Sequence, residues 1–447
     1  MDGVKEGKVR VGRTEEKGKE DIIEKGTRIR EGKEVKEVKE LKEVSLKETV
    51  GKDQKGAKDL KEPRENKEDR EEKRDDRLRE DKNLKEERMR EEKAQQEKFV
   101  RALKIVASGT ALREGIESIL RGKMGAIIMV GDSPQVMALV EGGFKIDCEF
   151  TPANMYELAK MDGAIVLSHD VRRILYANTQ LVPNPEIASC ETGIRHRTAE
   201  RMARQSGELV ISISKRRGLI TLYQGYSRYM LQDISLLLVK ANQALQTLEK
   251  YRMVLDKDLI TLSALEFENM VTVFEVARVI QRSELVMLIV KEIEGYINEL
   301  GVEGRLVSMQ MNELVVNVEN EILLIIQDYA VRPAEKSPRE IREHLNRWSP
   351  EELTDLVAIG RCLGYGATTG TLDLPVSSRG YRIMQKVPRL PALVIENLVE
   401  NFSDLPSILR ASMDDLDEVE GIGEVRARAI KNGLKRLQEQ VVLDQRI

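Results

Sequence analysis

The stretch MDGAIVLSHDVRRILYANTQLVPNPEIASCETGIRHRTAER, residues 161–201, carries the two motifs from which we infer the fold and the chemistry. At its start, Asp162 and Gly163 form a turn directly before the apolar run at residues 164–167. At its end, the basic triplet Arg195-His196-Arg197 stands before residues 198–200, which are typical of a helix start. An acidic turn before a strand and a basic triplet before a helix predict a βαβ-like unit that carries both motifs.

The basic triplet is suited to bind a polyanion such as triphosphate. Guanidinium groups match pairs of phosphate oxygens, and the first backbone N–H groups of a helix are free donors. Asp162, one strand away, could hold a divalent metal or take a proton from a hydroxyl group. Each motif alone has a plainer interpretation, a surface turn or a solvated basic cluster, but the two together favour a phosphate site. The Lys-Arg-Arg turn at residues 215–217 either adds cations to this site or is a solvated hairpin tip.

The composition is that of a soluble intracellular protein. The chain has 447 residues, enough for about two to four domains, and its formal net charge of -4 averages over strongly charged regions. Its three cysteines, Cys148, Cys190 and Cys362, have no metal-like spacing and indicate reduced thiols, and with three histidines a His-rich metal centre is excluded. No apolar run approaches the ~18 residues of a membrane helix, and the N-terminus resembles neither a secretory signal nor a transit peptide. We therefore expect a cytoplasmic protein without a membrane partner.

Residues 1–92 differ from the rest of the chain. Lys, Arg, Asp and Glu dominate there in nearly balanced numbers, and too little apolar surface is available to offset the entropy of ordering. We expect a charged, disordered extension, with an interaction tail as the functional alternative.

From residue 93 to about residue 230, expected helices and strands alternate. This order predicts an α/β domain with a mixed sheet flanked by helices. The helices are expected at residues 100–108, 112–121, 155–160 and 198–205, and the strands at 125–130, 164–168, 174–178, 209–214 and 219–223.

The chain from about residue 227 to residue 330 is expected to be helical. Amphipathic stretches cover residues 234–255, 265–279, 284–300 and 307–329. They carry no chemical motif, so we expect a bundle that spaces or oligomerises the two ends of the chain. Ser-Pro pairs at 337–338 and 349–350 predict helices at 339–347 and 351–363, followed by a loop at 364–381.

The C-terminal part, from residue 386, predicts a helix–hairpin–helix domain. Helices expected at 392–402, 405–411 and 413–419 precede the turn Gly421-Ile422-Gly423 and a basic helix at 424–437. Glycines let backbone N–H groups approach a DNA phosphate, while Ile422 packs beneath the turn. The candidate DNA contacts are Gly421, Ile422, Gly423, Arg426, Arg428 and Lys431, and the same helix supplies Lys435 and Arg436 as further cations for the DNA backbone. An acidic helix before the turn favours local, sequence-independent phosphate binding, and a purely structural helical hairpin is the alternative.

Together these motifs resemble the DisA family of diadenylate cyclases, from about residue 99 to the C-terminus. MDGAIVLS at 161–168 resembles the family's Asp-Gly-Ala motif, GIRHRTAER at 193–201 resembles its Arg-His-Arg motif, and DLDEVEGIGEVRARAI at 415–430 is similar to its helix–hairpin–helix. The resemblance implies condensation of two ATP molecules into cyclic di-AMP with release of two pyrophosphates, dependent on Mg²⁺ or Mn²⁺. It also implies a homo-octamer with face-to-face cyclase domains, and inhibition by branched DNA such as a Holliday-like recombination junction.

The resemblance also implies a division of the chain and a set of site residues. The parts are the charged extension at 1–92, a diadenylate cyclase domain at 93–230, a helical linker or oligomerisation domain at 231–385 and a DNA-binding domain at 386–447. The implied catalytic residues are Asp162, Arg195, His196 and Arg197. The implied ATP contacts are Gly163, Leu181, Ile194, Arg195, His196, Arg197, Thr198 and Ser214. The implied metal ligand is Asp162, with His196 as a second candidate.

Ile194 departs from the family pattern, which usually has Thr at this position. A hydroxyl group is missing there but the backbone N–H remains, so we expect a weaker nucleotide contact at most. Two roles stay open: Asp162 is either a metal ligand or a base, and His196 is a metal ligand, a hydrogen-bond donor or a structural residue.

The implied reaction requires two ATP sites that face each other. Each 3′-hydroxyl must attack the α-phosphate of the other nucleotide in line, so one domain with one nucleotide needs a symmetric partner. Arg195, Arg197 and the metal would stabilise the charge that develops on the phosphates. Two other functions compete with this one: a branched-DNA-binding scaffold whose ATP site does not turn over, and a nucleotidyltransferase that acts on DNA ends.

Overall fold

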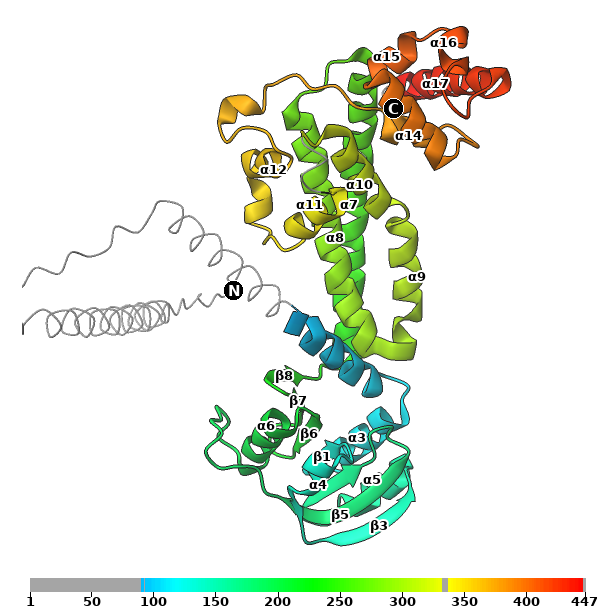
Figure 1. Cartoon of the computed structure of the whole chain (residues 1–447). Coiled ribbons are helices and arrows are strands. Elements are labelled where there is room, and N and C mark those ends of the chain that lie inside the picture. Colours follow the sequence, from blue (N-terminus) through cyan, green and yellow to red (C-terminus); the bar gives the residue numbers. More distant parts are fainter. Residues whose placement is uncertain (1–89, 92, 332–336, 445–447) are drawn as a thin grey trace, which may run out of the picture. The chain divides into compact units, whose positions relative to one another are not determined.

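In the computed structural model, residues 90–91, 93–331 and 337–444 are described (Figure 1). The charged extension expected at residues 1–92 lies outside this range except for residues 90 and 91. The described chain continues with a helix at residues 93–105, which begins earlier than the helix expected at 100–108. Within the described chain, no helix combines the length and the apolar character that a membrane span requires.

A mixed eight-stranded sheet forms the first part of the fold (Figure 1). Near its centre, β1 (Ala126–Val130) pairs in parallel with β4 (Ala164–Leu167) and antiparallel with β6 (Leu209–Ser214). Every residue of β1 is apolar and buried, because helices cover both faces of the sheet. On one side of this centre, β5 (Arg173–Leu181) pairs with β4, and both β2 (Val140–Glu141) and β3 (Phe144–Glu149) pair with β5. On the other side, β7 (Leu219–Gln224) pairs with β6, and β8 (Ser227–Met230) pairs with β7.

Helices pack on both faces of this sheet. On one face, α6 (Ile194–Ser206) brings Ala199 and Met202 into the same apolar cluster as Met129 of β1. On the other face, α3 (Ala111–Arg121) and α5 (Pro152–Leu158) pack around Ile128. Successive residues of β1 therefore point to opposite faces. The prediction of a mixed sheet flanked by helices is confirmed.

Three strands of the sheet were not predicted, namely β2, β3 and β8. The prediction that the chain is helical from about residue 227 was wrong, because β8 continues the sheet by pairing with β7. The long helix begins only at Ile234, where Oδ1 of Asp233 accepts a hydrogen bond from the Ser235 N–H at 2.8 Å.

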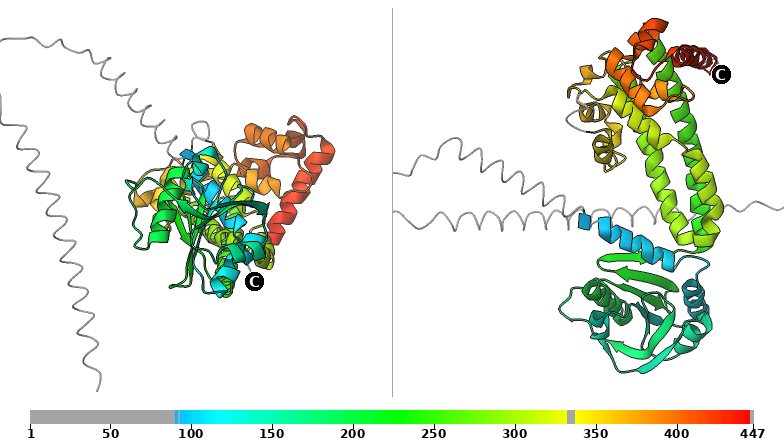
Figure 2. Two further views of the ribbon diagram at one scale, coloured as in Figure 1. Left: turned by 90° about the horizontal axis from the view of Figure 1, so that it is seen from below. Right: turned by 45° about the vertical axis from the view of Figure 1, so that its right-hand side comes forward.

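The second part of the fold is all-helical, as expected. Its two longest helices, α7 (Ile234–Glu268) and α8 (Val273–Leu300), lie side by side (Figure 2). The other elements of this part are the 3₁₀ turn η1 (Gly301–Gly304), α9 (Arg305–Leu314), α10 (Val318–Tyr329), α11 (Pro338–Leu345), η2 (Glu352–Thr354), α12 (Leu356–Cys362) and η3 (Thr369–Thr371).

Three helical stretches expected here are interrupted. The stretch at 265–279 is divided because Asn269, in the left-handed conformation, ends α7. The stretch at 307–329 is divided at Asn317, whose φ is 64°. The stretch at 351–363 begins as a 3₁₀ turn, and Asp355 caps the α-helix that follows.

The described residues of the C-terminal part form five helices. They are α13 (Tyr381–Gln385), α14 (Ala392–Phe402), α15 (Leu405–Arg410), α16 (Met413–Asp417) and α17 (Glu424–Asp444). They share an apolar cluster that includes Leu398, Leu416 and Ile430. The last helix extends beyond the predicted end at residue 437.

Candidate functional site

The acidic turn and the basic triplet meet on the surface of the sheet domain. Nη2 of Arg195 donates a hydrogen bond to Oδ1 of Asp162 at 3.2 Å, and the Asp162 side chain is fully exposed. The guanidinium lies over Gly125, since a Cβ atom at that position would be 2.5 Å from Nη1 of Arg195. The absence of a side chain at Gly125 therefore leaves room for Arg195 to reach the acidic turn.

Gly163 makes the acidic turn possible. Its φ is 115°, a conformation that L-residues with a side chain rarely adopt. A Cβ atom on Gly163 would lie 2.8 Å from the main chain of Asn178 in β5. The turn is therefore packed tightly against β5, and this packing fixes the position of Asp162.

The helix start differs from the prediction. α6 begins at Ile194 and not at Thr198, so the whole basic triplet lies inside the first turn. The cap residue Gly193 is extended and has no side chain that could accept a hydrogen bond from the first N–H groups. This turn therefore presents backbone donors and two guanidinium groups together, an arrangement suited to an anion.

His196 stands against the aromatic ring of Tyr223. The two rings meet edge to face, with centroids 6.4 Å apart. Burial lowers the pKa of the His196 imidazole below its ordinary value, and the nearby Arg217 and Arg228 act in the same direction against Glu191. This shift favours the neutral imidazole, a form that can donate one hydrogen bond or bind a metal.

The remaining predicted ATP contacts differ in their exposure. Ile194 is 83% exposed and Thr198 is half-buried. Leu181 is 7% exposed and belongs to the same apolar cluster as Ala199 and Met202 of α6. At the end of β6, Oγ of Ser214 accepts a hydrogen bond from the Arg217 N–H at 3.3 Å.

The candidate DNA contacts surround the turn between α16 and α17. Gly421 has a φ of 83°, and Ile422 is buried beneath the turn as expected. Arg426 donates to the Gly421 carbonyl, and Arg428 pairs with Glu424 at 2.7 Å. The third cation, Lys431, is directed elsewhere: its Nζ donates to the Leu409 carbonyl at the end of α15, at 2.9 Å.

Comparisons with known proteins assign the chain to a family. Residues 113–227, which include both motifs, match the family model described as "DisA bacterial checkpoint controller nucleotide-binding". Residues 231–372 match the model described as "DisA bacterial checkpoint controller linker region". The chain is 59% identical over 343 residues to the DNA integrity scanning protein DisA of Carboxydothermus hydrogenoformans, covering 97% of that protein and 77% of this chain. The chain belongs to the DisA family.

A second relative agrees with this assignment. The DNA integrity scanning protein DisA of Symbiobacterium thermophilum is 57% identical over 349 residues, which make up 78% of this chain and 98% of that protein. Among solved structures, DacA from Staphylococcus aureus is 18% identical and matches 28% of this chain and 85% of its own, with a TM-score of 0.24 that is too low to compare the folds. As a member of the DisA family, the chain carries a nucleotide-binding region of the diadenylate cyclase type.

The DisA-family site offers few ligands for a metal. Among the described residues, no group of three or more His, Cys, Asp and Glu side chains is arranged to hold a metal ion. Mg²⁺ commonly binds through one or two carboxylates together with substrate phosphates. The exposed carboxylate of Asp162, next to a turn suited to phosphates, fits a metal of this kind and would hold it together with the nucleotide.

Sequence reasoning missed the residues that support the basic triplet of this DisA-family chain. Glu191, Tyr223 and Arg228 form a polar cluster beside α6. Tyr223 and Arg228 belong to strands that follow α6 in sequence, so no local pattern indicates this contact. Glu191 stands four residues before Arg195, and this proximity was the one signal that could have pointed to it.

Proposed function

We propose that this DisA-family chain is a diadenylate cyclase that condenses two ATP molecules into cyclic di-AMP and releases two pyrophosphates. The observation that carries the proposal is the contact between Asp162 and Arg195, which joins the acidic turn to the first turn of α6. A carboxylate for the sugar hydroxyl and donors for the phosphates then stand within reach of one nucleotide.

The reaction requires two such sites. The 3′-hydroxyl of one ATP attacks the α-phosphate of the other, and the pyrophosphate leaves in line with the attack. One domain holds one nucleotide, so two domains must meet face to face with their sites opposed. The full exposure of the Asp162 side chain is consistent with a site that is completed by a second copy. We propose the homo-octamer because the chain belongs to the DisA family, whose resemblance implied that assembly.

The residues of the site have separate tasks in this scheme. Arg195, Arg197 and the N–H groups of the first turn of α6 bind the phosphates and stabilise the charge that develops on them. Asp162 orients the 3′-hydroxyl and favours loss of its proton. The neutral His196 donates a hydrogen bond to a phosphate oxygen. A bound Mg²⁺ or Mn²⁺, held by Asp162 and possible at His196, would supply further positive charge at the phosphates.

A product assay tests the proposal. The purified full-length chain is incubated with ATP and either Mg²⁺ or Mn²⁺, and the products are separated by chromatography. We expect cyclic di-AMP from the wild type and none from Asp162→Asn. The matched control is Asp147→Asn, because Asp147 forms a comparable exposed pair with Arg173 at 2.9 Å. If the wild type binds ATP without turnover, the chain is a scaffold; if DNA ends stimulate ATP consumption, it is a different nucleotidyltransferase.

We also propose that residues 386–447 form a helix–hairpin–helix domain that binds branched DNA and suppresses the cyclase. The left-handed Gly421 and the buried Ile422 support this domain. Gly421 allows a tight turn, and the Ile422 side chain is buried beneath that turn. Arg426 and Arg428 stand at the exposed start of α17. Suppression by a four-way junction should be lost in the Arg426→Ala, Arg428→Ala double variant, measured as the ratio of activities with and without DNA.

A further inference from the structure

The position of the basic triplet depends on the segment that leads to it. Residues 182–193 connect β5 to α6 and contain neither helix nor strand. Such a segment has no ladder of backbone hydrogen bonds to fix it, so its side-chain contacts decide where α6 begins. The contacts of Glu191, two residues before the cap Gly193, are the ones closest to the triplet.

Glu191 connects three elements of the sheet domain. Its Oε1 accepts a hydrogen bond from the Tyr223 hydroxyl of β7 at 2.8 Å and pairs with Nε of Arg228 in β8 at 2.9 Å. The carbonyl oxygen of Glu191 accepts a hydrogen bond from Nε of Arg197 at 3.3 Å. One residue thus ties the first turn of α6 to two neighbouring strands.

Tyr223 passes this restraint to His196. The Tyr223 ring is fully buried, and the edge-to-face contact with the imidazole leaves His196 little freedom to turn. Burial and the hydrogen bond to Glu191 raise the pKa of Tyr223 well above its ordinary value, so the hydroxyl remains a donor. The Glu191 side chain therefore orients two members of the triplet indirectly. Its contacts with Tyr223 and Arg228 hold the main-chain carbonyl that accepts from Arg197, and Tyr223 in turn contacts His196.

A second carboxylate anchors the same segment independently. Oε2 of the buried Glu200 accepts hydrogen bonds from the Ser189 hydroxyl and from the Cys190 N–H, the latter at 3.2 Å. Its Oε1 accepts from Arg204 at 2.5 Å. Because these contacts remain when Glu191 is changed, we expect such a change to displace the triplet without releasing the whole segment.

Glu191 is not placed to act as a base. Its side chain is only 9% exposed, and Oε1 already has two partners. A carboxylate in these surroundings is held for a structural purpose and has little access to a substrate hydroxyl.

We propose that Glu191 is a positioning residue of the cyclase reaction, which sets the orientation of Arg197 and His196 toward the nucleotide phosphates. The proposal rests on the proposed function of the chain. Displacement of phosphate donors by about 1 Å is enough to lower a rate by about a hundredfold, so the effect of losing Glu191 should be measurable.

The test uses Glu191→Ala and Glu191→Gln in the full-length chain. We measure kcat and KM for ATP, the binding of 3′-deoxy-ATP by calorimetry, and the thermal midpoint. 3′-Deoxy-ATP lacks the attacking hydroxyl and therefore reports binding without turnover. We expect Glu191→Ala to weaken binding by about tenfold and to lower kcat/KM by about tenfold to a hundredfold. Glu191→Gln should recover part of both, because its amide oxygen can still accept from Tyr223.

The matched control is Glu299→Gln. Glu299 is also buried, accepts a hydrogen bond from a tyrosine of the sheet, Tyr229, at 2.6 Å, and makes no contact with α6 that the structure records. The Glu299→Gln substitution should lower the thermal midpoint, while the affinity for 3′-deoxy-ATP and kcat/KM stay within about twofold of wild type.

Two outcomes overturn the proposal. One is a Glu191→Ala enzyme that binds 3′-deoxy-ATP and turns over ATP as the wild type does. The other is a loss of 3′-deoxy-ATP binding and of kcat/KM in Glu299→Gln as large as that in Glu191→Ala, because both losses would then reflect lower stability of the folded chain. Failure of the proposed function has a different signature, namely a wild-type chain that binds 3′-deoxy-ATP but forms no cyclic di-AMP with either metal.

Discussion

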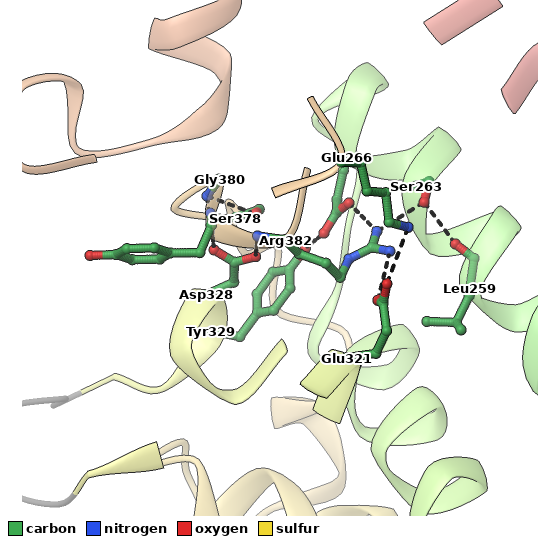
Figure 3. A network of polar contacts seen from close by, with 11 residues as sticks. Leu259, Ser263, Glu266, Glu321, Asp328, Tyr329, Ser378, Gly380 and Arg382 are labelled. Carbon is green, nitrogen blue, oxygen red and sulfur yellow. Dashed lines mark hydrogen bonds and ion pairs between the residues drawn. The ribbon is translucent and has the colours of Figure 1, made fainter. Parts of the chain in front are cut away.

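The guanidinium of Arg382 in α13 forms an ion pair with the carboxylate of Glu266 in α7, and both side chains are completely buried (Figure 3). Nη2 of Arg382 also donates to the Ser263 hydroxyl at 3.0 Å, and Nη1 lies 3.6 Å from Glu321 of α10. The pair therefore joins the first C-terminal helix to two helices of the preceding region. Tyr329 donates to the other oxygen of Glu266 at 2.8 Å, which completes the partners of that carboxylate.

Arg382→Met should destabilise the chain strongly. The substitution leaves Glu266 buried and without its cation, which costs about 3–5 kcal/mol when one partner of such a pair is removed. The free energy of unfolding can be followed in urea through Trp348, the single tryptophan of the chain, which packs against the helical core. The Arg382→Met, Glu266→Met double variant should recover much of the loss.

The surface pair of Arg252 and Asp256 provides the control for this prediction. Nε of Arg252 lies 3.0 Å from Oδ1 of Asp256 on α7, the helix that also carries Glu266. Arg252→Met should cost about 0.5 kcal/mol or less, as for other pairs of this spacing on a helix. If Arg252→Met and Arg382→Met lower the free energy of unfolding equally, the buried pair does not have the stabilising role assigned to it.

Asp328 makes the stability of this junction depend on pH. Its carboxylate accepts hydrogen bonds from the N–H groups of Gly380, Tyr381 and Arg382 at 2.9, 2.8 and 3.0 Å and so caps α13. Burial and the charge of Glu266 raise the pKa of Asp328 to about 7, above its ordinary value of 3.8. The folded chain therefore binds the proton more tightly than the unfolded chain does.

We accordingly expect the contribution of Asp328 to stability to fall as the pH rises from about 4 to 7. The contribution of Asp328 is complete below the pKa of the unfolded chain and is lost as the pH rises through the pKa of the folded chain. Glu284, whose pKa burial raises to about 6, acts in the same direction, so the comparison must be made with Asp328→Asn. Urea midpoints at pH 5, 6, 7 and 8 should decline less steeply in the variant; parallel declines would exclude Asp328 as the source.

Local signals in the sequence were sufficient for much of the fold. Ser337 forms the predicted cap, with its N–H donating to Glu340 at 2.7 Å. The apolar run that predicted a buried strand coincides with β1. The boundary between α7 and α8 was missed because α7 ends at Asn269. Neither a glycine nor a proline marks that end in the sequence. The edge strand β8 was missed because its half-exposed residues carry no strong pattern and pairing with β7 decides its conformation.

The site was predictable only where its residues share a motif. Asp162 and Arg195 were expected to be close because both belong to one unit of the chain. Glu191 was not expected to contact Tyr223, which is 32 residues away and reaches it only through the order of the strands. The start of α6 was placed too late because Gly193 caps it without a side chain, and the sequence signal of a cap residue is then absent.

Gly163→Ala should disrupt the acidic turn. The new Cβ atom would meet the main chain of Asn178 at 2.8 Å, and the φ of 115° is strained for alanine. We expect kcat/KM for ATP to fall by about tenfold or more, because the turn and Asp162 must move. Gly142→Ala is the control: its φ of 61° is also positive, but its Cβ atom would meet nothing within 4 Å. The interpretation fails if both variants lose activity to the same extent.

Ile194→Thr should strengthen nucleotide binding. The side chain at this position is 83% exposed at the start of α6, so the apolar group makes little contribution to the core. A hydroxyl there would add one hydrogen-bonding group beside the phosphates, and we expect 3′-deoxy-ATP to bind about two- to tenfold more tightly. The thermal midpoint without nucleotide should not change. Ile194→Ser offers the same hydroxyl on a smaller side chain and should act similarly; weaker binding by both variants would place this position outside the site.

Lys431 should contribute to the stability of the C-terminal part and not to the electrostatics of DNA binding. Its Nζ donates to the Leu409 carbonyl at 2.9 Å and so satisfies the end of α15, whereas Lys435 on the same helix is 77% exposed. Lys431→Met should therefore lower the thermal midpoint, while Lys435→Met should not. In anisotropy titrations with a four-way junction, removal of a phosphate contact reduces the slope of log K against log salt by about one. We expect this reduction for Arg426→Ala and an unchanged slope for Lys431→Met; a reduced slope for Lys431→Met would return this residue to the set of phosphate contacts.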